Sequence, residues 1–135
     1  MEANRSSLES RIQQVRNVRT VLLRLHKELL ESERLVYEQF YGKIPSKGEF
    51  FRLVIGHDWF SWLRPISQFI VQIDETLSAK ESVTLDQANQ LLDEARKLLS
   101  PLEDGTTLQK RYYRAIQHYP DIALLHAEIS QLLKN

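Results

Sequence analysis

Residues 58–77 read DWFSWLRPISQFIVQIDETL, and their apolar side chains recur in alternating steps of four and three. That spacing places one stripe of side chains along a single side of an α-helix, as in the seam of a helical bundle. The stripe consists of Trp59, Leu63, Ile66, Ile70, Ile73 and Leu77. We therefore predict a helix over 58–80 that packs against other helices.

Pro65 interrupts this helix near its start. Proline has no backbone N–H, and its ring clashes with the carbonyl group of residue i−4, so a helix that contains it is kinked or divided. We expect the break near Arg64, and we expect Asp58 to cap the helix N-terminus. Trp59 belongs to the stripe and is the predicted core residue, whereas Trp62 falls on a neighbouring face.

Glycines and prolines separate five further segments with helical periodicity. The longest covers residues 6–41 and corresponds to a helix of roughly 50 Å. Ser46 and Thr84 each stand three residues before a Glu or Gln, which is the capping-box spacing, and Pro120 suits the first turn of a last helix. The predicted helices besides 58–80 are 6–41, 47–55, 84–100, 107–118 and 120–133.

These segments predict a single all-α domain over residues 1–135, an antiparallel helical bundle with four principal helices and two short ones. The principal helices are 6–41, 58–80, 84–100 and 120–133. Their short connections suit antiparallel neighbours, and no segment alternates with period two for long enough to predict a strand. Segment 47–55 is apolar nearly all round, so we expect it to be buried or covered.

The first helix is longer than any predicted partner, which leaves its N-terminal part without cover in a single chain. We expect residues 1–17 to project as a helix end. Exposed apolar side chains favour association. We therefore predict either a homodimer that buries Leu8, Ile12 and Val15 or fraying of the helix before Val18.

The composition excludes several classes of protein. No Cys is present among the 135 residues, which excludes disulfides, thiolate nucleophiles and Cys-bound zinc. Eighteen Lys and Arg balance eighteen Asp and Glu, which argues against non-specific binding to nucleic acid. The longest uncharged run is the nine residues 65–73, against the roughly 20 of a membrane helix. We expect a cytoplasmic protein that binds neither nucleic acid nor membranes.

The charges are unevenly distributed along the chain. Residues 1–27 hold six basic and two acidic side chains, and residues 74–104 hold three and eight. We favour the interpretation that these segments face each other within the bundle; the alternative is a basic face for an anionic partner. Residues 110–119 mix cations with tyrosines, as in base-stacking surfaces. There we favour an amphipathic helix with Tyr112 and Tyr119 pointing inward.

The sequence contains no motif for metal binding or catalysis. None of the four His follows a Glu by three residues, so the Glu-x-x-His pattern of di-metal bundles is absent. No His-Glu-x-x-His, glycine-rich phosphate loop or Gly-x-Ser-x-Gly occurs either. We expect no metal, no cofactor and no enzymatic activity. The remaining enzyme hypothesis is a site that assembles from distant residues only in the folded chain.

Both tryptophans of the protein lie within residues 57–65. Core packing around the proline kink is the favoured interpretation of this segment. The alternative is a functional surface, since His, Arg and indole side chains at a kinked helix start suit a small-molecule pocket or a peptide groove. The residues of that surface are His57, Trp62 and Arg64.

Three patterns in the chain resemble those of a group of small uncharacterised bacterial all-helical proteins. They are Leu25-His26-Lys27 with Leu29 and Glu33, then Asp58-Trp59-Phe60-x-Trp62-Leu63-Arg64-Pro65, and then Ile70-x-x-Ile73-Asp74-Glu75. The resemblance extends over residues 22–133. It implies a bacterial cytosolic protein with one helical domain, and it implies no activity and no cofactor.

The leading functional hypothesis is a non-enzymatic helical bundle that binds another protein or a second copy of itself. The absence of a catalytic motif and the excess length of the first helix support it. The alternative is a small-ligand-binding protein with a pocket at the kinked helix around Trp59–Pro65.

Overall fold

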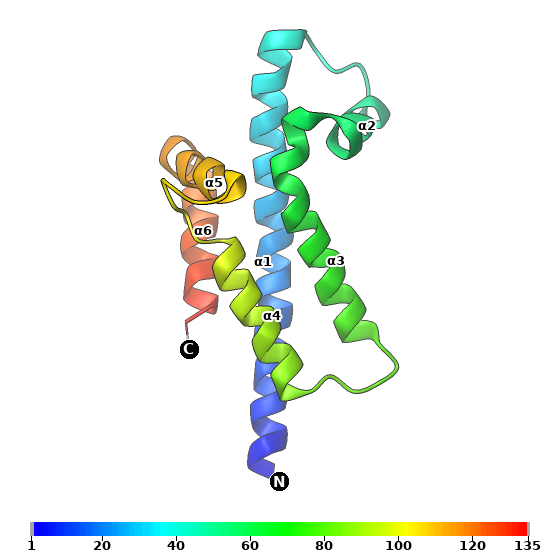
Figure 1. Ribbon diagram of the computed structural model, residues 1–135, viewed down its shortest axis with the longest axis vertical. Helices are drawn as coiled ribbons and strands as arrows, with labels where there is room; N and C mark the ends of the chain where they lie inside the picture. Colours follow the sequence, from blue (N-terminus) through cyan, green and yellow to red (C-terminus); the bar gives the residue numbers. More distant parts are fainter. Residues whose placement is uncertain (1, 135) are drawn as a thin grey trace.

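One helix, α1 (Glu2–Tyr41), runs the whole length of the molecule in the computed structural model (Figure 1). Its 40 residues correspond to about 60 Å. The structure describes the backbone of residues 2–134 and the side chains of residues 7–134. The other elements are α2 (Lys47–Gly56), the 3-10 helix η1 (Asp58–Leu63), α3 (Arg64–Ser78), α4 (Leu85–Leu98), α5 (Thr107–His118) and α6 (Pro120–Leu132).

The chain is an all-α bundle, and 82% of it is helical. Helices α3 and α6 run antiparallel to α1, while α4 runs parallel to it and antiparallel to α3 (Figure 1). The apolar stripe of α1 supplies the centre of the core, because α3, α4 and α6 all pack against it. Its buried members are Val15, Val18, Val21, Leu22, Leu25 and Leu29.

The seam predicted over 58–77 is confirmed from Leu63 onward. Leu63, Ile66, Ile70 and Ile73 are all buried. The chain divides at Arg64, as the position of Pro65 predicts, and α3 begins there.

The prediction for the residues before the break is wrong in two respects. Residues 58–63 form a 3-10 helix, and its N-cap is His57 rather than Asp58: the His57 Nδ1 accepts a hydrogen bond of 3.0 Å from the backbone N–H of Trp59. A 3-10 helix has three residues per turn, so Trp59 and Trp62 lie on the same side of it. Trp62 is 6% exposed and belongs to the core, whereas Trp59 is only half-buried.

Helix α2 is also unlike its prediction, because none of its side chains is buried. The sequence indicates an apolar segment that other elements cover. In the structure α2 packs mainly against η1, and the loop over residues 42–46 carries it to one side of α1 (Figure 1). Its apolar side chains therefore face a space beside α1 rather than the core.

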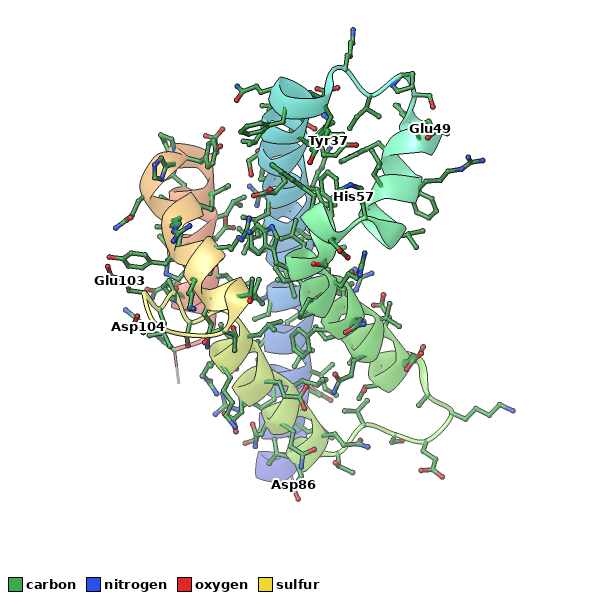
Figure 2. All side chains as sticks on the ribbon, turned by 45° about the horizontal axis from the view of Figure 1, so that its top comes forward. Tyr37, Glu49, His57, Asp86, Glu103 and Asp104 are labelled. Carbon is green, nitrogen blue, oxygen red and sulfur yellow. The ribbon has the colours of Figure 1, made fainter. Side chains whose placement is uncertain are left out.

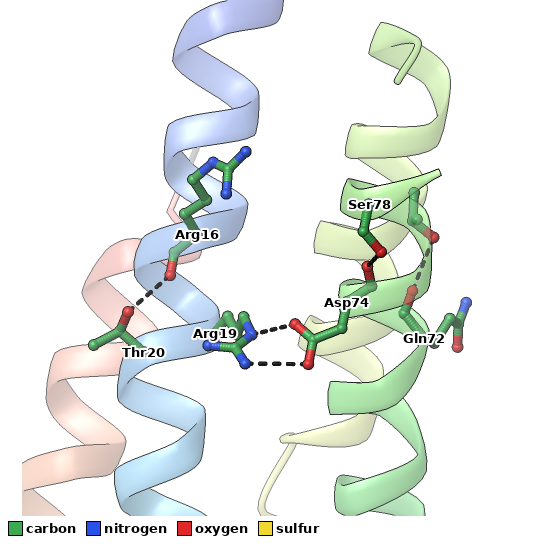
Figure 3. A network of polar contacts seen from close by, with 7 residues as sticks. Arg16, Arg19, Thr20, Gln72, Asp74 and Ser78 are labelled. Carbon is green, nitrogen blue, oxygen red and sulfur yellow. Dashed lines mark hydrogen bonds and ion pairs between the residues drawn. The ribbon is translucent and has the colours of Figure 1, made fainter. Parts of the chain in front are cut away.

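Several polar contacts tie the helices together. Arg19 of α1 binds Asp74 of α3 through both carboxylate oxygens, with Nη2 and Oδ2 3.1 Å apart (Figure 3). The hydrogen bond from Arg19 lowers the pKa of Asp74. Farther along α1, the Arg24 Nη1 lies 3.4 Å from the Glu128 Oε2 of α6.

A further polar contact joins α5 to α6 in the interior. The Tyr112 hydroxyl lies 2.7 Å from the His126 Nδ1, and Tyr112 is fully buried. Burial raises the pKa of Tyr112 and lowers that of His126, because both charged forms are poorly solvated there. Both groups are therefore neutral near pH 7.

Candidate binding groove

Helix α2 stands beside α1 because its connecting loop is fixed at both ends. Gly42 has φ +88°, a left-handed conformation that glycine adopts without strain, so the chain turns sharply off the end of α1. The backbone N–H of Ile44 donates to the Glu38 Oε2 at 2.8 Å. The Ser46 Oγ accepts from the backbone N–H of Glu49 at 3.1 Å and so caps α2.

A cavity of about 830 Å³ lies between α2 and the C-terminal half of α1, and we call it the α1–α2 groove. Its apolar lining consists of Leu30, Ile44, Phe50, Phe51, Val54 and Ile55. Its polar lining consists of His26, Glu31, Arg34, Ser46, Lys47 and Ser67. Phe51 and Ile55 are 64% and 58% exposed, so much of this apolar surface is open to solvent.

The charges along the groove differ in how far they are neutralised. The Arg34 guanidinium binds Glu31 and also lies 2.5 Å from the Glu38 Oε1. Its hydrogen bond with Glu31 raises the pKa of Arg34 and lowers that of Glu31. Burial lowers the pKa of His26, so this side chain is neutral near pH 7. Lys47 is exposed at the mouth of the groove.

A smaller cavity of about 220 Å³ continues the groove inward, and we call it the annex. It shares four lining residues with the groove, namely His26, Val54, Ile55 and Ser67. The others are Phe60, Leu63, Arg64 and Gln68. No carboxylate is among these eight residues, so the annex has a cationic side chain and no acidic one.

Arg64 is the charged residue of the annex. Its Nη2 donates a hydrogen bond of 3.2 Å to the carbonyl oxygen of His57, while its Nε is buried and has no hydrogen-bond partner in the protein. Among the residues whose side chains the structure describes, no carboxylate oxygen lies within 4.0 Å of Arg64. Its positive charge is therefore not neutralised by an ion pair.

Glu33 of α1 does not line the groove, and its carboxyl lies near the indole groups of Trp59 and Trp62. Burial raises the pKa of its carboxyl, and the charge of Arg111 and the indole N–H groups of Trp59 and Trp62 oppose that rise. Both indole nitrogens are buried without a hydrogen bond of normal geometry. Because Trp59 and Trp62 share one side of the 3-10 helix, both indoles point toward this single carboxyl.

The end of α1 and the start of η1 are joined by aromatic contacts. Tyr37 packs edge-on against the rings of His57 and Trp59, with centroids 5.5 and 5.9 Å apart, and Figure 2 shows Tyr37 close to His57. Phe40 and Tyr41 also contact Trp59. These contacts hold the first residues of η1 against α1. They therefore fix the position at which the chain enters α3 at Arg64.

The structure separates the three residues of the predicted functional surface. Arg64 lines the annex. Trp62 lies in the core, and His57 caps η1; neither residue lines the groove or the annex. The annex lies beside the kink at Arg64 and is continuous with the groove between α2 and α1.

The prediction that Leu8, Ile12 and Val15 lack cover in a single chain is wrong for Val15, which is 1% exposed. The end of α6 reaches this part of α1, where the Gln14 Nε2 donates to the carbonyl oxygen of Leu132 at 2.8 Å. Leu8 and Ile12 are half-buried. The side chains of residues 1–6 lie outside the described part of the chain.

The contacts agree in part with the interpretation that residues 1–27 and 74–104 face each other. Arg19 binds Asp74 of the acidic segment, whereas Arg24 binds Glu128 of α6, which lies outside it. In α5, Tyr112 points inward and is buried, while Lys110, Arg111 and Arg114 are exposed.

Sequence reasoning missed most residues of the groove. The pattern over 47–55 predicts only a covered apolar helix that includes Phe50, Val54 and Ile55. It does not predict that these side chains face Leu30 and Arg34 of α1. The available signal was that 47–55 is apolar nearly all round although it is too short for a core helix.

No group of His, Asp or Glu residues that could hold a metal ion occurs in the part of the chain that the structure describes. Among the same residues, no helix combines the length and the apolar character needed to cross a membrane. No protein-family model matches the sequence, and comparisons with curated proteins and with solved structures also give no match.

Proposed function

We propose that the protein is a binding protein that holds an apolar small molecule in the α1–α2 groove. The observation that carries this proposal is a cavity of about 830 Å³ whose walls include the apolar side chains of α2, a helix with no buried residue. Small-molecule sites are concave, largely apolar and roughly 300–1,000 Å³ in volume, with a few polar groups that orient the ligand. The groove has this size and this composition.

Packing energetics support the same proposal. The apolar side chains of α2 leave water only partly when the chain folds, so much of their hydrophobic free energy is not realised. A bound apolar molecule would complete their burial at about 25 cal/mol per Å² of apolar surface. Binding would therefore also stabilise α2 against local unfolding.

The test uses N-phenyl-1-naphthylamine, an uncharged dye that fluoresces strongly in apolar sites. We expect saturable binding to the wild-type protein and a decrease of about tenfold or more in affinity for Val54→Glu, which places a charge in the groove wall. The matched control is Leu124→Glu, the same charge at an exposed leucine of α6. Equal affinity of the dye for both variants, or no binding to the wild type, would overturn the proposal.

Self-association is the second candidate function, and the position of the exposed apolar residues favours it. Phe40, Tyr41, Phe51 and Ile55 are all exposed at the end of the molecule that carries α2. Exposed apolar patches mark interaction sites, so two copies pairing there would bury them. The N-terminal alternative is pairing through Leu8 and Ile12.

Light scattering at increasing protein concentration distinguishes the two pairing surfaces. If α2 mediates pairing, Phe51→Ser with Ile55→Ser abolishes any dimer, whereas Leu8→Ser with Ile12→Ser leaves it intact. The reverse result assigns pairing to the N-terminal end. A monomer at every concentration in the wild-type protein excludes self-association as its function.

A further inference from the structure

We infer that the ligand of the α1–α2 groove is an apolar chain that ends in a carboxylate, and that Arg64 binds the carboxylate in the annex. This inference rests on the proposed function, since it names the chemical class of the molecule that the groove holds. It is carried by the position of an unneutralised arginine at the inner end of an apolar cavity.

The first step is the state of Arg64. Its Nη2 is fixed by the carbonyl oxygen of His57, and its Nε is buried with no partner in the protein. The Nη1 group of Arg64 is not among the buried atoms and donates to no acceptor in the described part of the chain, so it is the donor that a ligand in the annex can reach. A carboxylate is the best match because its two oxygens accept from a guanidinium in parallel.

The second step is the charge around that donor. Arg34, the other arginine of the groove, is already bonded to Glu31 and Glu38. Arg64 has no such partner among the described side chains, and no acidic residue lines the annex. His26 adds no positive charge of its own near pH 7, because burial lowers its pKa, so Arg64 is the cation of the annex. The annex therefore favours an anion over a neutral or cationic group.

The third step is the continuity of the two cavities. The groove and the annex share His26, Val54, Ile55 and Ser67, so a single elongated molecule can occupy both. The outer part is lined by Phe50 and Phe51 and suits an apolar chain. The chain then lies along α2 with its head directed inward, toward the N-terminus of α3, whose helix dipole also favours negative charge.

Lys47 is the competing site for the carboxylate. It lies at the mouth of the groove, and binding there would place the head outward and the chain inward. Because Lys47 is exposed, its attraction for an anion is weakened by water and salt. Arg64 is less accessible to water, so we assign the head to Arg64.

The test measures displacement of N-phenyl-1-naphthylamine by dodecanoate and by dodecanol, which have the same chain. We expect the wild-type protein to bind dodecanoate about tenfold or more tightly than dodecanol. Arg64→Gln removes this preference and leaves the affinity for dodecanol unchanged, while Lys47→Gln keeps the preference. Arg52→Gln, an exposed arginine of α2 outside the groove, is the matched control.

A second measurement uses the wild-type protein alone and needs no variant. In the wild-type protein, the imidazole of His26 is titrated by NMR with dodecanoate or dodecanol bound. A carboxylate in the annex raises the pKa of His26, and dodecanol does not.

The outcomes separate the two proposals. Equal affinities for dodecanoate and dodecanol in the wild type overturn the anion inference and leave the groove as an apolar site. Failure of the dye and both probes to bind overturns both proposals. Loss of the preference in Lys47→Gln rather than Arg64→Gln, or an unchanged His26 titration, places the head elsewhere and overturns the assignment to Arg64.

Discussion

Trp59 and Trp62 differ in burial although they share one side of the same 3-10 helix. Trp62 is enclosed by the core, while Trp59 is half-buried and packs against the rings at the end of α1. Truncation of a buried indole leaves a cavity that the surrounding helices cannot close. At a half-buried position, neighbouring side chains and water fill much of the space.

We therefore predict that Trp62→Ala lowers the free energy of unfolding by about 3–5 kcal/mol and that Trp59→Ala lowers it by about 2 kcal/mol. Urea unfolding of the two variants measures both values. An order of effects opposite to this one would mean that the α-helical periodicity, and not the 3-10 geometry, describes residues 58–63.

The buried histidines make stability depend on pH. Burial lowers the pKa of His26 and of His126 in the folded protein. Between that lowered pKa and about 6.5 the unfolded chain therefore binds more protons, and the free energy of unfolding rises with pH. The stabilisation is complete above about pH 6.5 and is lost as the pH falls toward the folded-state pKa.

We predict that His26→Gln with His126→Gln reduces the loss of stability between about pH 7.5 and 5.5. The raised pKa of Glu33 makes the free energy of unfolding fall as the pH rises, which opposes the effect of the histidines. Glu33 is present in the variants and in the wild type, so the two are compared at each pH. Urea unfolding across this range gives the slopes. The control is His118→Gln, at an exposed position, and a change of slope in that variant as large as in the double variant would contradict the prediction.

At the scale of elements, α2 and α4 are capped in similar ways but differ in how they are packed. Ser46 caps α2, which has no buried side chain, and Thr84 caps α4, which has four. Loss of a cap costs about 1 kcal/mol of helix stability. The loss of a cap lowers the global free energy of unfolding only if that helix unfolds together with the core.

We predict that Thr84→Ala lowers the global free energy of unfolding by about 1 kcal/mol, and that Ser46→Ala leaves it nearly unchanged. In Ser46→Ala the amide hydrogens of α2 should exchange about fivefold faster, because only local opening becomes easier. Urea unfolding and hydrogen exchange measure the two quantities. A global effect of Ser46→Ala equal to that of Thr84→Ala would show that α2 unfolds with the core.

The sequence predicts the helices well because their signals are local. The division at Arg64, the left-handed Gly42 and the cap at Thr84 all follow from residue types at fixed offsets. The groove could not be predicted in the same way. Its existence depends on the direction in which the loop over residues 42–46 carries α2, and no periodicity encodes that direction.

Arg64 is the part of the candidate site that sequence reasoning identified, because an arginine beside a proline kink is conspicuous. The α-helical spacing places Trp62 on another face than Trp59, and the 3-10 helix does not obey that spacing. Trp62 therefore lies in the core, and His57 caps the 3-10 helix.

At the scale of the whole molecule, the part of α1 just before Val18 belongs to the folded core, because the end of α6 reaches Gln14 and Val15 is buried. A chain shortened to begin at Val18 loses the buried Val15 and the hydrogen bond between Gln14 and Leu132. We predict that its free energy of unfolding is about 3 kcal/mol lower than that of the full chain.

Urea unfolding measures the difference. The control is Leu8→Ala in the full chain, which should cost under about 1 kcal/mol because Leu8 is only half-buried. If the shortened chain is as stable as the full one, residues before Val18 are a projecting end, as the sequence alone suggests.

The pairing of α1 with α6 also determines what happens while the chain is being made. A ribosome finishes Tyr41 roughly 80 residues before it adds Pro120, a delay of roughly 4–16 s at 5–20 residues per second. During that time α3 and α4 are added one after the other, and α6 is the last partner of the stripe from Val15 to Leu29 to be made. The nascent chain therefore exposes apolar surface until synthesis is nearly complete, and a chaperone that shields it would act on the first helix rather than the last.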